Sequence, residues 1–268
     1  MQAAPCACNG VPIADVNRQR ARREPRGASL SAPPRAIARV AALDALRGLA
    51  ILAMVAYHFC FDLQYFGVTK WDFYRDALWL NARTIILSSF LLIAGASLVL
   101  ANRGGAPSAN FWRHVAIIGA CAIAVSVASY ALFPSSWIWF GVLHAIAVSL
   151  ILARPLVGRP IVALAIGVGV IAAGNLFTDR AFDGRTLGWL GFMTAKPRTE
   201  DYVPLFPWAG VLLIGVAAGH ALVRANFRHI AFAARWPRWM AWLGRHSLVT
   251  YMAHQPILIG LLYLAVGH

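Results

Sequence analysis

Four ionisable residues interrupt an apolar stretch, "LDALRGLAILAMVAYHFCFDL" from Leu43 to Leu63: Asp44, Arg47, His58 and Asp62. On a helix with about 3.6 residues per turn, Arg47 and His58 differ by only about 20° in direction and lie roughly 16 Å apart along the axis. Asp44 stands three residues before Arg47 and Asp62 stands four after His58, so each acid lies one turn from its basic neighbour. The spacing predicts one polar stripe with a cation at one end and a histidine toward the other.

The residue types in this stripe suit the transfer of a group from a phosphorylated donor. An arginine binds phosphate through charge-assisted hydrogen bonds, so Arg47 is the candidate donor-binding residue, with Asp44 as its partner. A histidine can take a proton from a hydroxyl or an amine, so His58 is the candidate base, with Asp62 to fix its tautomer. The alternatives are that Arg47 only extends to the lipid phosphates and that His58 is a satisfied core residue.

Two further histidines lie inside apolar stretches, His144 in "WFGVLHAIAV" and His254 in "RHSLVTYMAHQP". Tyr251, His254 and Gln255 recur at helical spacings of three and four, which gives a second polar stripe. We therefore expect His144, Tyr251, His254 and Gln255 to line an acceptor pocket near His58. Three histidines could also bind a metal, but neither HxxxH nor HExxH spacing occurs, so no metal site is predicted.

The elements that carry these residues are membrane helices. The chain has 268 residues, of which 60% are hydrophobic and 13% charged, and its mean hydropathy is +0.64. A helical span needs about 20 mostly apolar residues. Seven stretches approach that length: 43–66, 82–101, 114–133, 138–153, 160–177, 205–223 and 246–266. The fold class expected is an all-α, polytopic membrane bundle of about seven transmembrane helices.

The net charge of +14 is distributed by topology rather than gathered as a nucleic-acid-binding surface. If the N-terminus is cytoplasmic, sixteen arginines lie in the tail and inner loops, against seven cations outside that are matched by seven acids. This positive-inside asymmetry predicts an N-in, C-out protein of the inner membrane. Residues 1–40 are predicted to be a disordered basic cytosolic tail, and residues 41–268 the membrane domain.

Two connections are long enough to hold structure of their own. The outer segment 178–204 contains "TLGWLGF", which suits a short interfacial helix. The inner segment 224–245, "RANFRHIAFAARWPRWMAWLGR", spaces cations among aromatic residues and favours an amphipathic segment on an anionic leaflet. A plain positive-inside loop is the alternative.

Four segments together resemble the heparan-alpha-glucosaminide N-acetyltransferase catalytic-domain family, specifically its bacterial membrane proteins: "LDALRGLAILAMVAYHFCFDL", "FGVLHAIA", "DYVPLFPWAGVLLIGVAAG" and "LGRHSLVTYMAHQPIL". The likeness runs from about Leu43 to Leu262. The first segment also resembles the Arg-x10-His signature of the wider membrane acyltransferase superfamily, which falls on Arg47 and His58.

The resemblance implies acyl transfer, with an acyl-CoA such as acetyl-CoA as co-substrate, no bound cofactor, and a sugar or envelope glycan as acceptor. There is one departure: the lysosomal relative has Asn in place of His58 and a His in the following luminal loop, whereas this chain has no His between Phe59 and Arg113. The heparan substrate is therefore not expected here. The alternatives are a proton-coupled transporter and a non-catalytic partner in an envelope complex; the oligomeric state is not encoded in any recognisable motif.

Overall fold

The computed structural model describes residues 34–103, 108–199 and 201–266, with side chains from residue 41 onward. Helices make up the regular structure in these ranges, and no strand occurs there: α2 (Pro34–Tyr65), α3 (Ala77–Arg103), α4 (Ser108–Leu132), α5 (Val142–Ala153), η1 (Arg154–Leu156), α6 (Pro160–Leu176), η2 (Arg180–Phe182), α7 (Arg185–Gly188), α8 (Leu205–Arg224), η3 (Arg228–Arg235), α9 (Arg238–Arg245) and α10 (Ser247–Val266). The predicted all-α class is confirmed.

Five described helical segments are long and apolar enough to cross a membrane: Ala41–Tyr65, α3, α4, α8 and α10. The predicted stretches 138–153 and 160–177 also form apolar helices, but both are shorter than a full span. The surface of the bundle is also apolar, as expected for helices that face lipid: large side chains such as Ile161, Leu176 and Leu264 are more than four-fifths exposed. The chain is a multi-pass membrane protein, while seven spans and the N-in, C-out orientation stay predictions.

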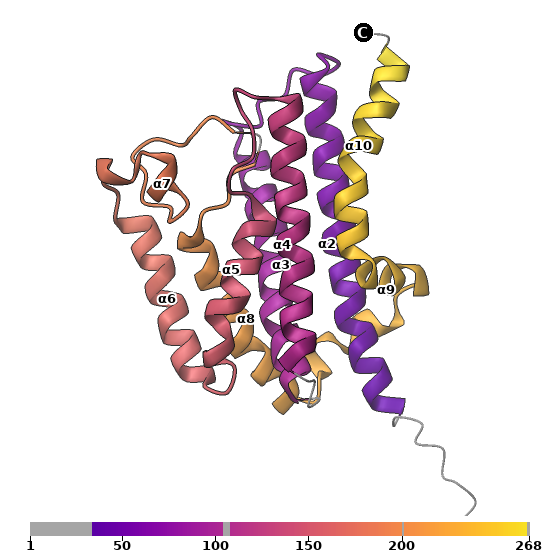
Figure 1. The fold of residues 1–268 in the computed structure, drawn as a ribbon. Coiled ribbons are helices and arrows are strands. Elements are labelled where there is room, and N and C mark those ends of the chain that lie inside the picture. Colours follow the sequence, from indigo (N-terminus) through magenta and orange to yellow (C-terminus); the bar gives the residue numbers. More distant parts are fainter. Residues whose placement is uncertain (1–33, 104–107, 200, 267–268) are drawn as a thin grey trace, which may run out of the picture. The chain divides into compact units, whose positions relative to one another are not determined.

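Helix α8 packs tightly between α3 and α6 because glycines line the contacts (Figure 1). A Cβ on Gly215 would collide with the backbone of Leu92 on α3, and one on Gly210 would collide with that of Gly167 on α6. In lipid, small residues permit the close backbone approach that stabilises helix pairs. Leu91, Leu212 and Val216 are fully buried in the resulting core.

Helix α2 lies alongside α10 and also packs on α9 (Figure 1). Gly48 on α2 and Gly244 on α9 lie back to back, with no room for a Cβ on either. Ala42 and Ala45 form a small second cluster with Ala233 of η3. These contacts fix the polar stripe of α2 against the C-terminal third of the chain.

The structure also bears on the tail and the two long connections. Residues 1–33 of the predicted tail lie outside the described residues, whereas α2 already begins at Pro34. The inner segment folds as η3 and α9, with Phe232, Trp239 and Trp242 about half exposed among its arginines. The outer segment holds the single-turn helix α7 in the predicted place.

Candidate functional site

Two of the predicted histidines meet at the contact between α2 and α10. The ring centroids of His58 and His254 are 4.9 Å apart. Tyr57 packs edge-on against His58, and the Nδ1 atom of His254 lies 2.6 Å from the carbonyl oxygen of Tyr251. His254 is 8% exposed, and its Nε2 atom has no hydrogen-bond partner among the described residues. The pair therefore offers a free ring nitrogen in a desolvated setting.

Asp62 and Gln255 form the second polar contact between the same helices. The Gln255 side-chain amide donates to Oδ1 of Asp62 over 2.8 Å, and Asp62 is only 2% exposed. The hydrogen bond described for Asp62 thus goes to Gln255, and the role predicted for Asp62 beside His58 stays a prediction. Oδ2 of Asp62 and Oε1 of Gln255 have no partner among the described residues. Buried polar atoms normally have partners, so this cluster marks a place where a substrate could supply them.

Arg47 and Asp44 form an ion pair at the other end of the stripe. Nη1 of Arg47 lies 3.2 Å from the Asp44 carboxylate, and Nη2 donates to the Ser97 hydroxyl of α3 over 2.5 Å. Arg245 at the end of α9 approaches the same carboxylate at 3.9 Å. The donor end therefore contains two arginines, and Ser97 and Arg245 are contributors that the sequence analysis did not identify.

His144 lies apart from the histidine pair in the contacts described. Its ring accepts the Gly141 amide over 3.3 Å and lies 3.4 Å from the Ser126 hydroxyl of α4. Its ring also packs on Phe140. These contacts fix the start of α5 to α4. The structure thus brings together His58, Asp62, Tyr251, His254 and Gln255, and places His144 in a neighbouring helix contact.

Asp201 of the outer segment lies near Tyr251, and sequence reasoning did not identify it as a site residue. Asp201 accepts the Val142 amide over 2.8 Å, which caps the positive end of α5. Partial burial raises the pKa of the Asp201 carboxyl, while the Val142 amide, Arg83 and Lys196 lower it. Asp201 is close enough to Tyr251 to interact electrostatically, as is Arg83 to Tyr57. The only sequence signal was the position of Asp201 at the start of "DYVPLFPW".

The arrangement can carry out proton transfer. In the described part of the chain, no three His, Cys, Asp or Glu residues come together as a possible metal site. Two imidazoles in contact can relay or exchange a proton between two reacting groups. Tyr251, whose ring packs against His254, supplies a hydroxyl donor beside the pair.

Comparisons with known proteins place these residues in one family domain. A family model described as "Heparan-alpha-glucosaminide N-acetyltransferase, catalytic" matches residues 39–256, a range that contains Arg47, His58 and Gln255. No curated protein and no solved structure matches the chain.

Proposed function

Because the chain belongs to the heparan-alpha-glucosaminide N-acetyltransferase catalytic family, we propose that it transfers an acetyl group from a cytosolic acetyl-CoA-type donor to a sugar or envelope glycan. The family match suggests a membrane acetyltransferase, and the donor and acceptor are our proposal. The observation that carries the proposal is the contact between two histidines: His58, which shares the α2 stripe with Arg47, and His254 of α10. An inner-membrane location follows from the charge asymmetry of the loops.

The donor would bind at the Arg47 end of the stripe. The diphosphate and the ribose phosphate of coenzyme A need cations, and Arg47 and Arg245 are both present there. Asp44 neutralises them before the donor arrives, and Ser97 holds the Arg47 guanidinium in place. The roughly 16 Å between Arg47 and His58 along a helix can be spanned by an extended thioester arm.

The transfer step would take place at the histidine pair. One imidazole takes the proton from the acceptor hydroxyl or amine as that atom attacks the thioester carbonyl carbon. The carbon–sulfur bond breaks, and the proton passes from the first imidazole through the second to the leaving thiolate, so both imidazoles end neutral and the products are the acetylated acceptor and free coenzyme A. Tyr251 is placed to stabilise the oxyanion that forms between these two steps. Asp62 and Gln255 hold α2 and α10 in register around the pair.

The experiment that tests the proposal uses purified protein in liposomes with acetyl-CoA labelled in the acetyl group. We expect coenzyme A release in step with label on an amino sugar, a hydroxyl-bearing sugar or an extracted glycan fraction. Uptake of a solute driven by a proton gradient, without acetyl-CoA consumption, would instead establish the transporter.

A further inference from the structure

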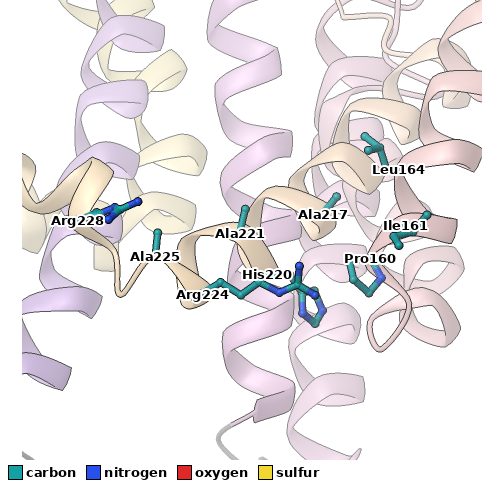
Figure 2. Close-up of a pocket in the computed structure, with 9 residues that line it drawn as sticks. All are labelled: Pro160, Ile161, Leu164, Ala217, His220, Ala221, Arg224, Ala225 and Arg228. Atoms are coloured by element: carbon teal, nitrogen blue, oxygen red, sulfur yellow. The ribbon is translucent and has the colours of Figure 1, made fainter.

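A groove lies between the first turns of α6 and the last turns of α8, away from the histidine pair (Figure 2). Its volume is about 450 Å³. Ile161 and Leu164 form the α6 wall, whereas Ala217 and Ala221 form the α8 wall and leave the space open because their side chains are small. Ile161 is 81% exposed, so this wall faces lipid hydrocarbon in a membrane protein.

Two arginines stand at the mouth of this groove. Arg224 ends α8 and Arg228 begins η3, and both are exposed (Figure 2). The ion pairs among the described residues involve Asp44 and Asp72, and none includes either of these arginines. The third polar residue of the groove, His220, is already engaged, with Nε2 2.6 Å from the Val157 carbonyl oxygen. The mouth is thus positively charged, and no acidic side chain among the described residues forms an ion pair with either arginine.

The apolar walls and the two arginines together suit a ligand that has an anionic group and a hydrocarbon chain. A phosphate group would meet the guanidinium of Arg224, which points toward His220, while Arg228 lies farther along the mouth and adds positive charge (Figure 2). A hydrocarbon chain would lie against Ile161, Leu164 and the alanines. A nucleotide is a poor fit because no Phe, Tyr or Trp lines the groove, and its one aromatic ring, His220, is already engaged with the Val157 carbonyl oxygen. Basic pockets between membrane helices at the positive side bind anionic lipid headgroups. We propose that this groove is a binding site for one anionic phospholipid of the adjacent leaflet.

The proposed lipid would stay outside the transfer site. It would bind next to η3, the segment that leads through α9 to the donor end. Arg228 belongs to η3, and η3 continues into α9, whose Arg245 reaches Asp44. A phosphate bound by Arg224 and attracted by the charge of Arg228 would restrain the connection between α8 and η3. This proposal is independent of acetyl transfer, because it concerns binding at a separate groove.

The test measures lipid retention by native mass spectrometry of the full chain. Protein purified in detergent is mixed with dioleoyl phosphatidylglycerol or dioleoyl phosphatidylcholine, and bound lipid is counted. We expect preferential retention of one phosphatidylglycerol. The double variant R224Q/R228Q should lower that retention about thirtyfold, because each arginine near a headgroup contributes about a fivefold factor. Ala221→Trp, which fills the groove at an exposed position, should also lower it.

The matched control is R103Q/R113Q, which removes two arginines from helices that do not line the groove. We expect it to retain phosphatidylglycerol as the wild type does. Equal loss in both double variants, or equal retention of the two lipids, would overturn the proposal in favour of general surface charge. Displacement of the lipid by millimolar glycerol phosphate or by coenzyme A would also overturn it, since the site would then bind a soluble phosphate.

Discussion

At the scale of single residues, the polar side chains between α2 and α10 are buried, and a buried polar atom needs a hydrogen-bond partner to avoid an energetic cost. A buried polar atom without a partner costs about 1–3 kcal/mol, and three such atoms occur in the contact formed by Asp62, His254 and Gln255. The hydrogen bond from Gln255 to Asp62 offsets part of that cost and joins the helices. Groups that are stable but incompletely paired are expected where a substrate binds, which agrees with the proposed transfer site.

The planar shape of the Arg47 guanidinium leads to a prediction about donor binding. Arg47→Lys keeps the charge but cannot bind both Asp44 and Ser97 as the guanidinium does. We expect the KM for acetyl-CoA to rise about tenfold, the value of one charge-assisted hydrogen bond, with little change in thermal stability. Steady-state kinetics at limiting donor measure this. Arg103→Lys is the control, and an unchanged KM in Arg47→Lys would restrict Arg47 to contacts with lipid phosphates.

The residues that the sequence predicted differ physically from those it missed. Arg47, His58 and His254 are conspicuous because charge inside an apolar stretch is costly and must have a cause. Asp201, Arg83 and Lys196 belong to polar surroundings, where charges are ordinary. Only the packing of the outer segment on α5 places Asp201 at the Val142 amide and near Tyr251. The pairing of Asp62 with Gln255 likewise required the register between two helices 193 residues apart in sequence.

At the scale of elements, the close contact between α2 and α9 depends on two glycines. A methyl group on Gly244 would collide with the Asp44 carbonyl oxygen, so Gly244→Ala must displace α9 and with it Arg245. We expect a destabilisation of about 1–3 kcal/mol, as for other overpacked contacts. The measurement is the thermal unfolding of the purified protein.

Gly260→Ala on α10 is the matched control because a Cβ there meets nothing within 4 Å. It should leave stability unchanged or raise it slightly, since alanine favours helix over glycine. Equal melting temperatures for Gly244→Ala and the wild type would show that α9 is not packed on α2 as described.

The outer segment makes a prediction about pH. Asp183 accepts the amide and the hydroxyl of Thr194, both over 2.7 Å, and these bonds lower the pKa of its carboxyl below the ordinary 3.8. A carboxyl with a lowered pKa stabilises the fold above its unfolded pKa, and that contribution is lost as the pH falls through the folded value. The two bonds from Thr194 should therefore persist at pH 5 and be lost only below about pH 4.

Thr194→Val tests this account by removing the hydroxyl bond to Asp183. The pKa of Asp183 should move up toward its ordinary value, and the remaining bond from the residue 194 amide should be lost at higher pH. Carboxyl chemical shifts of Asp183 followed from pH 6 to pH 2 report both effects. An identical titration in the two proteins would contradict the described contact.

Elements were predictable from sequence where hydropathy alone determines them. The five long spans coincide with apolar stretches that need no knowledge of their neighbours. The helices α5 and α6 are too short to be established as spans by length alone. The glycine contacts of α8 were also unpredictable, since a glycine marks a close approach without naming its partner.

At the scale of the whole molecule, the orientation in the membrane decides which face receives each substrate. The arginine asymmetry predicts that position 228 is cytoplasmic and position 185 external. Arg228→Cys and Arg185→Cys, each in a chain whose four cysteines are replaced by serine, should react with an impermeant maleimide from opposite sides of the membrane. Labelling of both positions from one side would refute the predicted orientation and the inward-facing donor end.

The central claim is that the contact between His58 and His254 performs acetyl transfer, and it is tested by substituting each histidine and measuring turnover. His58→Ala and His254→Ala should insert, purify and melt as the wild type does, while turnover of labelled acetyl-CoA falls about 10²- to 10⁴-fold. His58→Asn should show whether an amide can replace the imidazole. His246→Ala, at an exposed position between α9 and α10, should keep its activity. Near-full turnover in both alanine variants would contradict the assignment.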